Sequence, residues 1–99
     1  MVHGRLALSG GNPGFRIWVI GTNRILGVEE APEEKPCMPR QLQELAASDN
    51  LIFADFTVVS VTRDEPGVMR MVRIVSARNI VVTDMQLRLL RRIEAVTVK

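Results

Sequence analysis

Apolar and polar residues alternate with a period of two along most of this chain, and such alternation predicts half-buried strands. The clearest case is the run 15–20, where Phe15, Ile17 and Val19 point one way and the intervening side chains point the other way. Turns rich in glycine, proline and asparagine separate this run from its neighbours. The predicted strands are residues 5–8, 15–20, 24–28, 51–62 and 68–75, followed by 80–82 as a last short strand or as an extension of the one before it.

A helix with one apolar face is predicted in the middle of the chain, after a connector of different composition. The connector, residues 29–39, holds three prolines and four glutamates, which exclude a continuous helix there. In the helix, residues 39–48, the apolar side chains Leu42, Leu45 and Ala46 recur at helical spacing. A helix this short is stable only when it is docked, so we expect it to cover an apolar opening.

The C-terminal residues 83–99 are predicted to form a second, basic amphipathic helix. Thr83 and Gln86 have the spacing of a capping box, and apolar residues follow at helical spacing. This apolar stripe packs either on the rest of the chain or against the same stripe of a second copy, and we expect the second arrangement, a homodimer. The residues expected at this partner interface are Met85, Arg88, Leu89, Arg92 and Ile93.

Three strands, a helix and two further strands is the element order of the OB-fold, a five-stranded Greek-key β-barrel, and the chain resembles that family over roughly residues 4–82. The resemblance rests on the order and spacing of the elements, because the fold has no diagnostic sequence motif. It implies a mainly β, OB-like barrel over residues 1–82, in which the first helix plugs one end and the C-terminal helix is an appendage.

The resemblance also implies where a ligand would bind: on the second and third strands, flanked by the loops at residues 10–14 and 63–67. Trp18 either faces outward or belongs to the core, and the sequence leaves both open. Facing outward, its indole and the neighbouring guanidiniums would form a stacking surface for single-stranded nucleic acid. The nucleic-acid-binding residues expected on this basis are Arg16, Trp18, Arg24, Arg63 and Arg70.

The charges are unevenly distributed, although the net charge is only +2. Residues 1–28 carry three arginines and no acid, residues 29–62 carry seven acids against two bases, and residues 63–99 carry eight bases against four acids. The two basic flanks either serve an anionic polymer or an acidic partner, or pair with the acidic middle of the chain itself. Asp55 stands alone in an apolar strand, and we expect it to pair with an arginine.

The composition excludes several classes of protein. Hydrophobic residues make up 46% and charged residues 24% of the chain, which is typical of one globular domain. Cys37 and His3 are the only residues of their types, so we expect no internal disulfide, no Cys/His zinc site and no catalytic triad. No apolar run has the length of a signal peptide or a transmembrane helix.

These observations predict a cytoplasmic, non-enzymatic binding module without metal, cofactor or membrane contact. Its expected partner is single-stranded nucleic acid. The alternative is a protein, including a second copy of the same chain.

Overall fold

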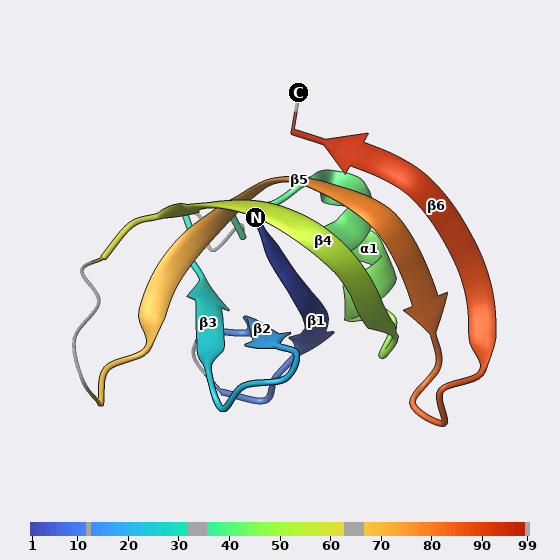
Figure 1. Ribbon diagram of the computed structural model, residues 1–99, viewed down its shortest axis with the longest axis horizontal. Helices are drawn as coiled ribbons and strands as arrows, with labels where there is room; N and C mark the ends of the chain where they lie inside the picture. Colours follow the sequence, from blue (N-terminus) through green and yellow to red (C-terminus); the bar gives the residue numbers. More distant parts are fainter. Residues whose placement is uncertain (12, 32–35, 63–66, 99) are drawn as a thin grey trace.

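Six β-strands and one short helix make up the computed structural model, which describes residues 1–11, 13–31, 36–62 and 67–98 (Figure 1). The expectation of a mainly β protein with a helix between the third and fourth strands is confirmed. In chain order the elements are β1 (Val2–Leu8), β2 (Phe15–Val19), β3 (Ile25–Val28), α1 (Arg40–Ala47), β4 (Leu51–Ser60), β5 (Arg70–Thr83) and β6 (Leu89–Thr97).

Five of these strands close into a barrel. β1, β2 and β3 form an antiparallel meander, and β4 returns to the other edge of β1. β5 pairs antiparallel with β4 and parallel with β3, where Leu26 lies opposite Arg70 and Val28 lies opposite Val72. This parallel pairing completes the ring, and β6 lies outside it as a sixth strand paired with β5.

The interior of the barrel is filled from one side of each strand, because successive side chains of a strand point to opposite faces. A row of apolar residues that face one another across five strands is at most 4% exposed. This row consists of Leu26, Ile17, Leu6, Ile52 and Val82.

Helix α1 packs its apolar face against β1 and β4, behind the strands in Figure 1. Leu42 and Ala46 are fully buried and Leu45 packs against the core, on the face that the helical spacing predicted. Arg40 and Glu44 form an exposed ion pair one turn apart, with 3.2 Å between Nε and Oε1. Exposed pairs of this kind contribute only a few tenths of a kcal/mol, so burial of the apolar face holds the helix in place.

Strand β5 joins two predicted segments, 68–75 and 80–82, so the second of them is an extension of the first. A β-bulge marks the junction: Asp55 lies opposite Arg78 and Phe53 opposite Val81, which leaves β5 with one residue more than β4. Asn79 occupies the bulge with a φ of 53°, in the left-handed region that asparagine tolerates better than most residues.

The prediction of a C-terminal helix over residues 83–99 is wrong, because this segment forms a tight turn and strand β6. Asp84 closes the turn: its Oδ1 accepts hydrogen bonds from the backbone N–H groups of Gln86 and Arg88, both at 2.9 Å. The backbone N–H of Asp84 also donates to the carbonyl of Arg88. A side chain that accepts hydrogen bonds from the backbone N–H groups after it can cap a helix or close a turn. The capping-box pattern therefore did not distinguish a helix from a turn here.

Tertiary pairing decides that this segment is a strand. β6 pairs along the edge of β5, and its residues Ile93 and Val96 pack against the barrel core. Met85 and Leu89, which were expected at a partner interface, stay exposed, and so does Leu90. The helical spacing is present in the sequence, but backbone pairing with β5 and burial of β-branched residues outweigh it.

Leu87, in the turn between β5 and β6, has a backbone conformation that leucine rarely adopts, with a φ of 65° and a side chain that is 64% exposed. This conformation costs a residue with a Cβ about 1–2 kcal/mol, and glycine commonly fills it in hairpin turns. We expect Leu87→Gly to raise the free energy of unfolding, measured by urea denaturation, by about 1 kcal/mol. Leu89→Gly is the control and should lower stability, because Leu89 lies in β6 without a positive φ. A Leu87→Gly variant no more stable than the parent would contradict the expectation.

Candidate functional site

Six outward-facing side chains, one from each strand, form a row across the outside of the sheet. Leu6, Ile17 and Ile52 are fully buried, so their neighbours along the same strands point outward. The strand pairing brings these neighbours into register from β3 to β6. We call this set the outer row; it consists of Ile25, Trp18, Arg5, Phe53, Val81 and Arg92.

Trp18 lies on the outer face and is half-buried, which settles the alternative that the sequence left open. The guanidinium of Arg5 lies over the indole, with 5.1 Å between its carbon and the ring centroid. At the other end of the side chain, Trp18 Nε1 donates a 2.8 Å hydrogen bond to the carbonyl of Thr22 in the turn between β2 and β3. The ring is therefore fixed in place with its polar atom satisfied.

Arg5 and Phe53 belong to this surface, although the sequence did not single them out. Arg5 lies opposite Trp18 on one side and opposite Phe53 on the other. Its Nε atom is buried and has no hydrogen-bond partner among the described residues, so contact with the ring, rather than a bond from Nε, holds the guanidinium. Only the register of β1 against both β2 and β4 reveals this arrangement, and a single strand pattern does not contain that register.

The other residues expected to bind nucleic acid do not all gather here. Arg16 lies on the outer face of β2 beside Trp18, and its Nε donates to the carbonyl of Pro13 at 3.3 Å. Arg24 is exposed in the turn before β3. Arg70 begins β5 opposite the buried Leu26 and is not part of the outer row. Arg63 lies outside the described residues.

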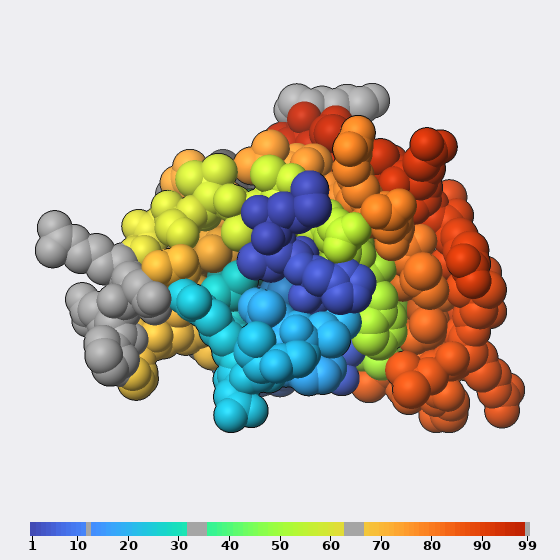
Figure 2. All heavy atoms as spheres, in the orientation of Figure 1, coloured from blue at the N-terminus to red at the C-terminus, as the bar shows by residue number. Residues whose placement is uncertain are grey.

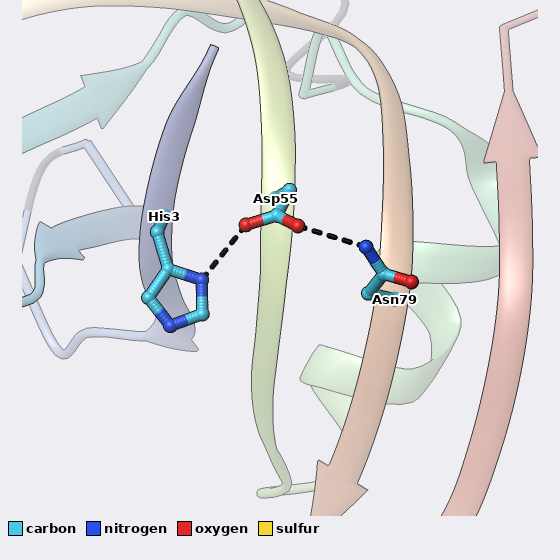
Figure 3. A network of polar contacts seen from close by, with 3 residues as sticks. All are labelled: His3, Asp55 and Asn79. Atoms are coloured by element: carbon cyan, nitrogen blue, oxygen red, sulfur yellow. Dashed lines mark hydrogen bonds and ion pairs between the residues drawn. The ribbon is translucent and has the colours of Figure 1, made fainter.

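A polar network borders the outer row on the side of the sheet away from α1 (Figure 3). Asp55 in β4 receives two hydrogen bonds of 2.9 Å, one from Asn79 Nδ2 to Oδ2 and one between His3 Nδ1 and Oδ1. These bonds, that from Asn79 first and that from His3 second, hold the pKa of Asp55 below its usual value, while partial burial opposes them. The expectation that Asp55 pairs with an arginine is wrong, because its partners are a histidine and an amide.

One part of the acidic middle segment pairs with a basic flank. Arg73 Nε lies 2.6 Å from Glu29 Oε2, and this hydrogen bond and the opposite charge raise the pKa of Arg73 above its usual value. Internal pairing therefore involves Arg73 on β5, whereas Arg92 in the outer row is exposed. This pair supports the interpretation that the basic flanks pair with the acidic middle segment, and contact of the other arginines with an anionic partner stays a prediction.

The residues expected at a partner interface do not lie on one common surface. Met85 and Arg88 lie in the turn before β6, and Leu89 is exposed at the start of β6. Arg92 belongs to the outer row, and Ile93 packs against the core. In Figure 2 the β5–β6 hairpin, in orange and red, lies at the margin of the molecule.

A groove of about 750 Å³ lies between α1 and the end of β6. Its lining includes the exposed ion pair of Arg40 and Glu44 and residues at the end of β6, and it includes no residue of the outer row. The lining residues are Met38, Pro39, Arg40, Gln41, Glu44, Ala95, Val96, Thr97 and Val98.

The described residues hold no cluster of three or more histidine, cysteine, aspartate or glutamate side chains that could bind a metal ion. Within the same part of the chain, no helix is long and apolar enough to cross a membrane. Comparisons with protein-family models, with curated proteins and with solved structures find no match for this sequence. The rings and guanidiniums of the outer row offer stacking and contacts to anions.

Proposed function

We propose that this chain is an OB-like Greek-key barrel that binds single-stranded nucleic acid through the outer row. The spatial order β4-β1-β2-β3, with a long connection before β4, fits a Greek key. The helix between β3 and β4 and the closure of the ring by β3 against β5 favour the OB-like arrangement among small barrels.

The observation that carries the proposal is the sequence of side chains at the centre of the outer row: an indole, a guanidinium laid over it, and a phenyl ring on the next strand. Every nucleobase has a flat aromatic face, so such a surface accepts bases of any identity. Stacking on one aromatic side chain is worth about 1–3 kcal/mol per base.

The size of the row fits a short stretch of nucleic acid. Neighbouring strands are about 4.8 Å apart, so six strands span an arc of roughly 24 Å. Sites on barrels of this kind cover about 4–16 nucleotides, and the outer row matches the short end of that range.

Charges around the row favour a modest number of phosphate contacts. Arg16 and Arg24 flank Trp18 on β2 and in the following turn, and Arg92 ends the row on β6. Asp55, kept ionised by its two hydrogen bonds, lies next to the row and repels phosphate. We therefore expect about three phosphates to be contacted, rather than the larger number typical of strongly basic proteins.

The test is a titration of the intact protein with a mixed-sequence DNA strand of about 12 nucleotides, following the fluorescence of Trp18. With about three contacts, the affinity should fall roughly 20-fold between about 50 and 200 mM salt. The fluorescence should change because a base stacks beside the only indole of the chain. Unchanged fluorescence and no binding at low salt would overturn the proposal and favour the alternative, a module that binds proteins.

A further inference from the structure

Strand β6 is paired on one side only. It hydrogen-bonds to β5, and among the described strands none lies along its other edge; in Figure 1 it lies at the right-hand margin. Leu89–Thr97 contains no proline, its charged residues Arg91, Arg92 and Glu94 are of both signs, and each of its residues is exposed or half-buried. Edge strands of this length are commonly shortened, covered or protected by proline and charged residues, because an open edge pairs readily with another strand.

The side chains of β6 are self-complementary about its central residue, Ile93. An interface between two identical copies related by a two-fold axis requires that residue i faces residue j and residue j faces residue i. Two β6 strands that pair antiparallel with Ile93 on the axis meet this condition with matched chemistry. Arg92 of each copy then faces Glu94 of the other copy, which gives two ion pairs. The flanking pairs are Arg91 with Ala95, Leu90 with Val96 and Leu89 with Thr97.

The charged residues of β6 favour the register centred on Ile93 over the register centred on Arg92. Opposite charges that face each other across paired strands stabilise the pair, whereas like charges in that position destabilise it. A register centred on Arg92 would place that arginine directly opposite its own copy. Centring on Ile93 instead forms two ion pairs.

The backbone of β6 is regular where this pairing would form. From Arg91 to Thr97 the strand keeps one register against β5, in which Glu94, at the level of the bulge residue Asn79, has no paired residue. The shift in register lies before Arg91, where Leu90 has no partner in β5. At the far end, the N–H of Val98 donates to the carbonyl of Val75 at 2.9 Å. β6 is thus held in an extended form that a second strand can join without rearrangement.

Two large apolar side chains at the start of β6 are exposed to solvent. Leu89 and Leu90 are 53% and 55% exposed, and pairing of β6 would cover part of both.

We infer that this protein is a homodimer in which the β6 strands of two copies pair antiparallel about Ile93, joining their sheets edge to edge. The inference depends on β6 and shares only Arg92 with the proposed nucleic-acid-binding surface, so the molar mass of the protein without nucleic acid tests it separately. The two-fold axis is perpendicular to the joined sheet, so the two outer rows would lie on the same face.

The experiment measures the molar mass of the full chain by size-exclusion chromatography with light scattering at micromolar concentration. The parent protein should have twice the mass of the 11.1 kDa chain. Arg92→Glu should give the monomer mass, because it places two carboxylates opposite each other at both ion pairs. The charge exchange Arg92→Glu with Glu94→Arg should restore the dimer. Both residues are exposed, so circular dichroism should show the same fold for all three proteins.

Three results would overturn the inference. They are a monomeric parent protein, an Arg92→Glu variant that is still dimeric, and a charge exchange that fails to restore the dimer. The second would assign the dimer to another surface, and the third would exclude the register centred on Ile93. As a matched control, Arg88→Glu changes charge equally in the turn outside β6 and should leave the parent mass unchanged.

Discussion

Replacing Trp18 by alanine is expected to weaken the binding of a short single-stranded oligonucleotide by at least about ten-fold. The indole is the largest flat surface of the outer row, and its loss removes both a stacking partner for a base and the support on which the Arg5 guanidinium lies. The measurement is the fluorescence anisotropy of an end-labelled strand, because the variant has lost its own indole.

Two variants accompany Trp18→Ala. Trp18→Phe keeps an aromatic face and should retain most of the affinity. Met85→Ala removes a side chain that is 60% exposed in the turn before β6, away from the row, and should bind as the parent does. Equal affinity of Trp18→Ala and the parent would remove Trp18 from the binding site and leave the proposed function without its central contact.

Replacing Phe56 by alanine is expected to lower the free energy of unfolding by about 3–5 kcal/mol. Phe56 is fully buried and is one of the largest side chains in the barrel core, so truncation leaves a cavity in addition to the lost burial of the ring. For a domain of this size the loss corresponds to a fall in Tm of at least about 12 °C. Thermal unfolding followed by circular dichroism at one fixed protein concentration would measure it.

Phe53→Ala is the matched control, since Phe53 is the same residue type on the same strand but faces outward in the outer row. It should cost much less stability than Phe56→Ala and should reduce the affinity for the oligonucleotide. Similar losses of stability in the two variants would contradict the assignment of their side chains to opposite faces of β4.

The period-two alternation of apolar residues was enough to locate the barrel strands, and helical spacing was enough to locate the buried face of α1. Both patterns depend on side chains close together in sequence. It was not enough at residues 83–99. There the choice between helix and strand depended on the open edge of β5, which lies in a different part of the chain. Asp84 could equally have begun a helix, and only the partner strand decided that it closes a turn.

The candidate site was predictable to a similar degree. Trp18 and Arg16 were found because they alternate with apolar residues on one strong strand. Arg5 and Phe53 were missed because their place beside Trp18 is set by the pairing of β1 with both β2 and β4. Asp55 was assigned the wrong partner for a related reason: Asn79 reaches it from a bulge that no local pattern indicates.

β1 is hydrogen-bonded on both sides, and one of its neighbours is far along the chain: His3 and Asp55 are 52 positions apart. Bringing such distant segments together costs conformational entropy before the contacts between them form. Chains of this topology therefore fold in about milliseconds to seconds rather than microseconds. On the ribosome, β1, β2 and β3 emerge before β4 and β5. Their apolar face stays uncovered until those two strands are synthesised. A chaperone that shields this face during synthesis would act at the stage where aggregation competes most strongly with folding.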